Sequence, residues 1–487
     1  MRAALLLLVL GACPAPTPTP SESDADTDAD SDTDTDTDTD ADADPIVVAA
    51  DRYAFPSRTD PSVDSAVYDG QVMRQLLIAD LSTHIGGLTD RLNATFIPDA
   101  GDVEAELAFY FDFDSVTSGG LTPLHSPGLP LHQATYDAVS VDKDLNGKIA
   151  GNDSATDHAD WSTSFTGFAA PGVTTPESLV RHWFAALDAQ AVAWSAGTYP
   201  LDPSGAPVAG VHLTDDGLDL QQLVEKFLRG AVALSQGGDD YLDDDVPGKG
   251  LLSSHADVEA GEPYTPLEHA WDEGWGYFGG SRGYGGWTDM EIAQGAVDVD
   301  VSGTIDLHRE WSTGASNNAA KRDLGAVSPV DFTGDAWAAF HGGRELLAST
   351  TGDLTPAELD ALRGYRDEAL LAWERAIAAT VVHYINEVLV DMGRFGTPDY
   401  VYADHAKHFS EMKGFALGFQ FDPHSPLTDA QFAELHGYLA DRPVLPGADA
   451  TAVEAYAADL RAARALLGTV YGFAPANLGD VDGTQGW

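Results

Sequence analysis

The hydrophobic residues of this chain recur with the period of an α-helix, and this pattern constrains the fold more than any other feature of the sequence. Thr355, Pro356 and Glu358 have the order of a capping box. The Thr hydroxyl can accept from the Glu N–H, the Glu side chain can reach back to the cap, and proline stands where a missing N–H costs nothing. Apolar residues then follow at steps of three and four, which predicts one helix over 355–392.

The same start signal precedes two other periodic segments, predicted as helices over 265–278 and 428–439. Further helical periods cover 66–86, 175–195, 218–235, 328–349, 402–419 and 452–471. Alternating strand patterns are scarce, so the sequence predicts an all-α fold of one helical bundle or two packed bundles, with acidic loops inserted between helices. No linker with a shift in composition interrupts 46–487, which we therefore expect to be one helical domain.

The first thirteen residues resemble a bacterial lipoprotein signal. Arg2 supplies a positive charge, an apolar run follows, and a small-residue cleavage site ends at Cys13, the only cysteine. The resemblance implies that Cys13 is lipidated and that the mature chain is held in the cell envelope, at the outer membrane or facing the periplasm. We expect contact with the membrane through this lipid anchor only.

Residues 14–45 form a segment in which every even position from Asp24 to Asp44 is Asp. Such a segment lacks large apolar side chains and its carboxylates repel, so we expect a disordered linker. The whole chain has 25 Lys and Arg against 78 Asp and Glu, a net charge of -53. Setting aside Arg2 and the twelve acids of the first 45 residues leaves 24 basic and 66 acidic residues. This balance argues against nucleic acid as a partner.

The segment from Asp142 to Asp153 has the order of a calcium-binding loop, D-x-D-x-N-G-x-I-x-x-x-D. Oxygens at alternate positions converge as the chain curls, glycine at position 6 allows the sharp turn, and an acid at position 12 closes the shell. The closing acid here is one methylene shorter than the usual Glu. The predicted ligands are Asp142, Asp144, Asn146, Lys148 through its backbone carbonyl, and Asp153.

A second loop begins at Asp298 and keeps most of this order, but it places Arg309 at position 12 and Glu310 one residue late. A local extension of the loop can bring Glu310 to the ion, or Asp306 can hold a water. The predicted calcium ligands are Asp298, Asp300, Ser302, Thr304, Asp306 and Glu310.

Two predicted helices carry histidine next to carboxylates at helical spacing. His269, Asp272 and Glu273 stand at i, i+3 and i+4, and His408 and Glu411 form another His-x-x-acid pair. If the two elements face each other, imidazole and carboxylate can hold iron, zinc or copper. The alternative is that each histidine is a core residue bonded to a neighbouring carboxylate.

The segment from Pro266 to Gly279, together with Ser62 to Gln71 and Asn318 to Asp323, resembles an uncharacterised family of bacterial surface lipoproteins related to the imelysins. The resemblance covers about residues 50–475. It implies an imelysin-like helical domain and carries the family's His-x-x-acid element onto His269 and Asp272, where imelysins have Glu at the second position.

Three functions remain open. The sequence favours a non-enzymatic protein that binds calcium and an unknown small ligand or surface partner. An imelysin-type metallopeptidase is the first alternative, although no H-E-x-x-H string or nucleophile elbow occurs. A structural or adhesive surface module is the second.

Overall fold

The longest helix, α11 (Pro356–Gly393), runs through the helical domain and contacts helices on several sides. In the computed structural model, the described residues are 45–153 and 157–487, which lie in one compact unit, Asp40–Trp487. Cys13 and most of the acidic segment 14–45 lie outside them. The described residues form α-helices and short π- and 3-10 turns, with only isolated β-bridges, which confirms the all-α prediction.

The remaining α-helices are α1 (Asp69–Ala94), α2 (Asp102–Phe111), α3 (Ser115–Ser118), α4 (Trp161–Ser164), α5 (Pro176–Ser195), α6 (Leu220–Leu228), α7 (Pro266–Phe278), α8 (Asp289–Gln294), α9 (Ala315–Gly325), α10 (Phe332–Ser349), α12 (Tyr402–Ala416), α13 (Asp429–Leu439), α14 (Ala450–Tyr471) and α15 (Pro475–Leu478).

The capping boxes predicted from sequence are formed. In α7, α11 and α13 the N-cap threonine accepts from the third backbone N–H, and the Glu or Gln there bonds back to the cap. Each such cap contributes about 1 kcal/mol to helix stability. The sequence therefore fixes where these three helices begin.

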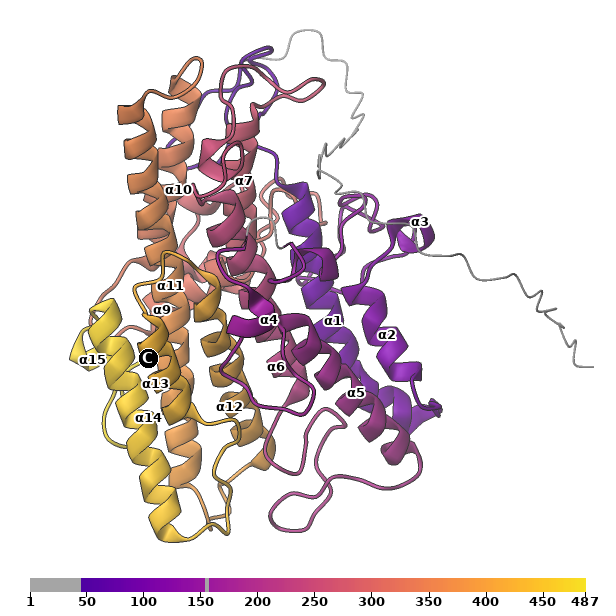
Figure 1. The fold of residues 1–487 in the computed structure, drawn as a ribbon. Helices are drawn as coiled ribbons and strands as arrows, with labels where there is room; N and C mark the ends of the chain where they lie inside the picture. The colour runs from indigo at the N-terminus through magenta and orange to yellow at the C-terminus, as the bar shows by residue number, and fades with distance from the viewer. Residues whose placement is uncertain (1–44, 154–156) are drawn as a thin grey trace, which may run out of the picture. The chain divides into compact units, whose positions relative to one another are not determined.

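The helices pack in a series that starts from α11 (Figure 1). Helix α11 packs against α9, α10, α12 and α14, and α12 also packs against α6. Helix α6 in turn contacts α1 and α5, and α1 contacts α2 and α7. None of the described helices combines the length and the apolar character needed to cross a membrane.

The segment predicted as one helix over 218–235 differs from that expectation, because α6 ends at Leu228 and the chain continues in π-helical turns, Arg229–Leu234 and Gln236–Tyr241. A close backbone approach accompanies the change: a Cβ on Gly230 would lie 2.5 Å from the Cα of Gly418. Helices α2 and α9 were also not predicted.

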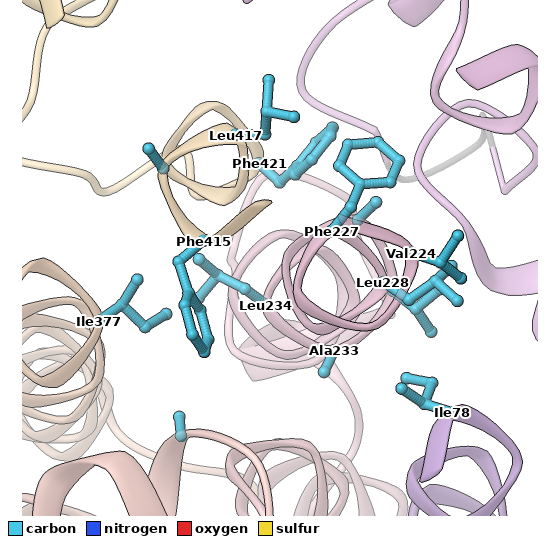
Figure 2. Close-up of a cluster of buried hydrophobic side chains, with 14 of the residues drawn as sticks. Ile78, Val224, Phe227, Leu228, Ala233, Leu234, Ile377, Phe415, Leu417 and Phe421 are labelled. Carbon is cyan, nitrogen blue, oxygen red and sulfur yellow. The ribbon is translucent and has the colours of Figure 1, made fainter. Parts of the chain in front are cut away.

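Side chains around this turn fill the centre of the core (Figure 2). Phe227 lies beside Phe421, with ring centroids 6.0 Å apart, and in this view Phe415 lies between Leu234 and Ile377. These side chains are almost fully buried. Residues of α1, α6, α11 and α12 therefore pack together where α6 gives way to the π-helical turn.

The glycine contact makes a stability prediction. We expect Gly230→Ala to lower the free energy of unfolding by about 1–3 kcal/mol, because the added methyl meets backbone that cannot turn aside. Gly364→Ala, in α11, has nothing within 4 Å of the added methyl and should stabilise by roughly 0.5–1 kcal/mol. Denaturant unfolding of both variants measures the difference, and equal effects would contradict the close approach.

A pair of buried carboxyl groups lies between α11 and the loop before α13. Glu374 accepts from Ser425 and from Tyr471, each at 3.0 Å and at the same oxygen, and its carboxyl group interacts with that of Asp422. Burial raises the pKa of Asp422 to about 6 and, with Asp422 as a neighbour, raises that of Glu374 well above its ordinary value. The folded pair therefore holds a proton that the unfolded chain releases at lower pH.

This pair predicts a pH dependence of stability. Since the folded pKa values are raised, the stabilisation is present at low pH and is lost as pH rises through about 6. Asp422→Asn keeps a hydrogen bond to Glu374 without a second charge, so it should gain on the order of 2 kcal/mol relative to the native chain between pH 4 and 8. Unfolding across that range, with exposed Asp459→Asn as control, measures the gain; a constant difference would contradict the shared proton.

Candidate calcium site

The second acidic loop lies between α8 and α9, and its two ends pair with each other. Ala296 and Trp311 form an antiparallel bridge at its base, and the Val297 N–H donates to the Glu310 carbonyl at 3.1 Å. Inside the loop, one carboxylate oxygen each of Asp298, Asp300 and Glu310 lie within 4.8 Å of one another. Among the described residues, this is the only group of three or more His, Cys, Asp or Glu side chains that meets that spacing.

Backbone N–H groups hold the first two carboxylates in place. Asp298 accepts from Ser302 and Gly303, each at 2.9 Å, and Asp300 also accepts from the Ser302 N–H at 2.9 Å. The turn requires φ 81° at Gly303 and φ 58° at Val301, a conformation that a β-branched residue rarely adopts. Hydrogen bonds from Ser302 lower the pKa of Asp300, which keeps this group ionised.

Glu310 closes the loop from inside the protein. Only 2% of it is exposed, and its two oxygens accept from the N–H groups of Val299 at 2.7 Å and Asp306 at 2.9 Å. Arg309, at the position where the usual loop has its closing acid, points outward with 74% of its side chain exposed. The loop is thus one residue longer than the usual calcium-binding loop. This is the local extension that would allow Glu310 to reach the ion.

The other predicted ligands of this loop differ in whether their oxygens have partners elsewhere. The Ser302 hydroxyl lies 3.0 Å from that of Thr304 and donates to the Thr304 carbonyl at 3.2 Å. Asp306 is engaged elsewhere, because one of its oxygens accepts from Gln133 at 2.8 Å and from the His308 N–H at 2.9 Å. We therefore expect Asp306 to support the loop instead of contacting the ion directly.

A segment that the sequence pattern does not predict supports this loop. Leu131 forms a parallel bridge with Ile305, and the Ile305 N–H donates to the Pro130 carbonyl at 2.9 Å. Gln133 follows and bonds to Asp306. These residues have no alternating or helical pattern, so nothing in the local sequence indicates the contact.

The first acidic loop has a more open arrangement. Asp142 accepts from Ser115 at 2.7 Å, Asp144 accepts from the Gly147 N–H at 2.5 Å, and Asp153 pairs with the Lys148 ammonium at 2.7 Å. The three carboxylates are not gathered within the spacing seen in the second loop. Asn146 accepts from Asn152 at 2.8 Å. Calcium here would require the ion pair of Asp153 to open.

The His269 element has hydrogen-bond partners of its own on α7. Asp272 accepts from Arg344 and from Tyr53, each at 2.9 Å, and both ends of the ion pair with Arg344 are fully buried. Glu273 accepts from Gln71 at 2.7 Å and lies 3.7 Å from the His269 ring.

The second histidine element, on α12, is held in a similar way. His408 bonds to the buried Asp391 at 2.8 Å, and Glu411 is hydrogen bonded to Tyr384. The described structure does not gather the two histidine elements into one group of ligand atoms. Both match the alternative in which a helical histidine contacts a neighbouring carboxylate.

A model of a domain of unknown function, DUF4856, matches residues 137–286. The match covers the first acidic loop and α4 through α7, including His269, and ends before the second loop. No curated protein and no solved structure matches the chain significantly.

The buried ion pair predicts how Asp272 contributes to stability. Asp272→Asn leaves Arg344 without its nearest counter-charge, which should cost about 3 kcal/mol of unfolding free energy. Because the partner is an arginine, we expect the same loss with and without EDTA. A loss that disappears in EDTA would instead make Asp272 a metal ligand. His269→Ala is the comparison, with a smaller effect expected because its ring is not fully buried.

Proposed function

We propose that this chain is a lipid-anchored protein of the cell envelope that binds calcium in the loop 298–310 and acts as a non-enzymatic ligand-binding protein. The observation that carries the calcium assignment is the convergence of Asp298, Asp300 and the buried Glu310. Among the described residues, no Lys or Arg forms an ion pair with any of the three, which leaves their charges for a bound cation.

The donor atoms favour calcium over a transition metal. The converging side chains offer carboxylate oxygens, the Ser302 hydroxyl and the Thr304 carbonyl lie in the same loop, and imidazole takes no part in the group. Hard oxygen ligands in a flexible loop suit Ca²⁺, whereas iron, zinc and copper prefer imidazole or sulfur. A site for those metals at His269 and His408 is therefore the weaker proposal.

A cavity beside the loop supports the ligand-binding part of the proposal. It has a volume of about 470 Å³ and is lined by Asp300, Glu310, Arg309, Arg282 and Trp287, among others. A cation in the loop would lie at the wall of this cavity. Calcium would then both stabilise the loop and offset the carboxylates that face a ligand.

The envelope location rests on the lipoprotein signal and Cys13, and the relation to imelysins rests on the motif around His269. Neither points to catalysis. A metallopeptidase would need an open metal site with a general base, whereas Glu273, beside His269, accepts a hydrogen bond from Gln71, and Asp391, beside His408, also pairs with Arg394. A structural or adhesive role for the calcium loop is the second candidate, because the loop ties Leu131 to the start of α9.

Calcium titration of purified protein tests the assignment. Glu310→Gln preserves the side-chain shape but removes the buried charge, so the calcium affinity should fall at least about tenfold, or ~1.4 kcal/mol. Isothermal titration calorimetry measures this fall, and the calcium-induced rise in melting temperature should shrink with it.

Asp142→Asn is the charge-matched control, since it changes the first loop by the same amount. The second-loop assignment predicts unchanged affinity in this variant at the site that Glu310→Gln weakens. If Asp142→Asn abolishes calcium binding and Glu310→Gln does not, the ion belongs to the first loop and the assignment is wrong. Elemental analysis that finds two calcium ions per chain would show that both loops bind.

A further inference from the structure

A second cavity, which we call the basic pocket, is lined by Gly295, Trp311 and Ser312, which flank the loop 298–310. It has a volume of about 370 Å³ and lies between α1, α6, α8, α9 and α12. Its charged lining consists of Lys226, Arg229, Lys321, His125 and a single carboxylate, Glu225. Burial and the nearby Arg229 lower the pKa of His125, which keeps its ring neutral.

The charges in the basic pocket do not balance. Glu225 lies 3.0 Å from the Lys226 ammonium and 4.0 Å from the Arg229 guanidinium, so one carboxylate faces two cations. Lys321, from α9, has no hydrogen bond or ion pair among the described residues. The pocket therefore carries an excess of two positive charges in a chain whose net charge is -53.

This excess of positive charge favours an anion in the pocket. The chain has about three acidic side chains for every basic one, so a cluster of cations facing one carboxylate is not what composition alone would produce. Lys226 and Arg229 are partly buried and Lys321 is exposed at the edge of the pocket, and an oxyanion placed between the three cations relieves their mutual repulsion.

Uncharged polar residues also line the pocket. Ser312 is 1% exposed, lines the basic pocket, and its hydroxyl has no hydrogen-bond partner in the described structure. Asn318 and Gly314 also line it, and Gly314 is the N-cap of α9, where no side chain caps the helix. The positive end of the α9 dipole and its free N–H groups add to the field of the cations.

We infer that the basic pocket binds a small molecule through an oxyanion group, a carboxylate or a phosphate, held by Lys226, Arg229 and Lys321. Its volume is near the lower end of the range for small-molecule sites, which is about 300–1,000 Å³. Trp311 and Phe415 flank the polar groups and give the body of the ligand an apolar contact. This site is separate from the calcium site, and its existence does not depend on calcium being bound there.

Anion titrations test the inference. Sodium phosphate and sodium succinate are titrated into the purified protein at constant ionic strength and a low, fixed calcium concentration, with sodium chloride as reference. We expect phosphate, succinate or both to bind by calorimetry and to raise the melting temperature, whereas chloride does neither. Binding of phosphate alone identifies a phosphate site, and binding of succinate alone identifies a carboxylate site.

Lys321→Gln is the decisive variant, because its ammonium has no partner whose loss would disturb the fold. It should weaken binding of the active anion at least tenfold, and the melting temperature in chloride should be no lower than that of the native chain, because one of the mutually repelling cations is removed. Ser312→Ala should weaken binding several-fold. Lys249→Gln, which removes an exposed cation outside the pocket, should bind like the native chain.

Two results would overturn the inference. One is that neither phosphate nor succinate binds more strongly than chloride. The other is that Lys321→Gln and Lys249→Gln bind the anion equally, which would mean general charge screening and no specific site. Neither result bears on the calcium assignment, which is tested by Glu310→Gln in the absence of added anion.

Discussion

Repulsion among carboxylates is the constraint on which the rest of this structure depends, because 66 acidic side chains share residues 46–487 with 24 basic ones. Most acids cannot pair with a cation, and the fold gives them other partners. Asp188 accepts from backbone N–H groups at the start of α2, and Asp80 accepts from Leu124 and His125. Burial and the neighbouring Asp422 raise the pKa of Glu374 inside the core. Asp298, Asp300 and Glu310 likewise accept from backbone N–H groups, and the proposed calcium ion would be a further partner for these converging carboxylates.

Because basic side chains are few, a buried cation such as Arg344 pairs with more than one carboxylate. Arg344 is fully buried, pairs with Asp272 and Glu268 on α7, and donates to Ser65, so it fastens the segment before α1 to α7 and α10. A buried pair of this kind adds little net stability compared with apolar packing, but removal of one partner is costly. The Arg344 ion pairs instead determine which helices pack against each other. Lys321, by contrast, faces a cavity without such a partner, which is why the basic pocket differs from the structural ion pairs.

The sequence predicted the features that depend on neighbours along the chain. Capping boxes at Thr265, Thr355 and Thr428 act over three residues, and their helices begin where expected. The order of Asp298, Asp300 and Gly303 also acts locally, so the second loop could be recognised. The features that the sequence did not predict depend on contacts between residues far apart in the chain. The approach of Gly230 to Gly418 accompanies a π-helical turn, and the Gln133 contact supports Asp306. Spacing along α7 and α12 placed histidine next to acid, yet only the packing assigns Arg344 to Asp272 and Asp391 to His408.

The calcium loop and the basic pocket share a stretch of backbone. Glu310 closes the loop, and Trp311 and Ser312, the next two residues, line the pocket; on the other strand, Gly295 lines the pocket and accepts from the Ser312 N–H at 2.8 Å. An ion that fixes Glu310 therefore also restricts the start of the pocket wall. Coupling between two binding sites is reciprocal. If bound calcium raises the affinity of the pocket for an anion, the bound anion raises the affinity for calcium by the same factor. The proposed calcium site and the proposed anion site would therefore be coupled through the backbone on either side of the Ala296–Trp311 bridge.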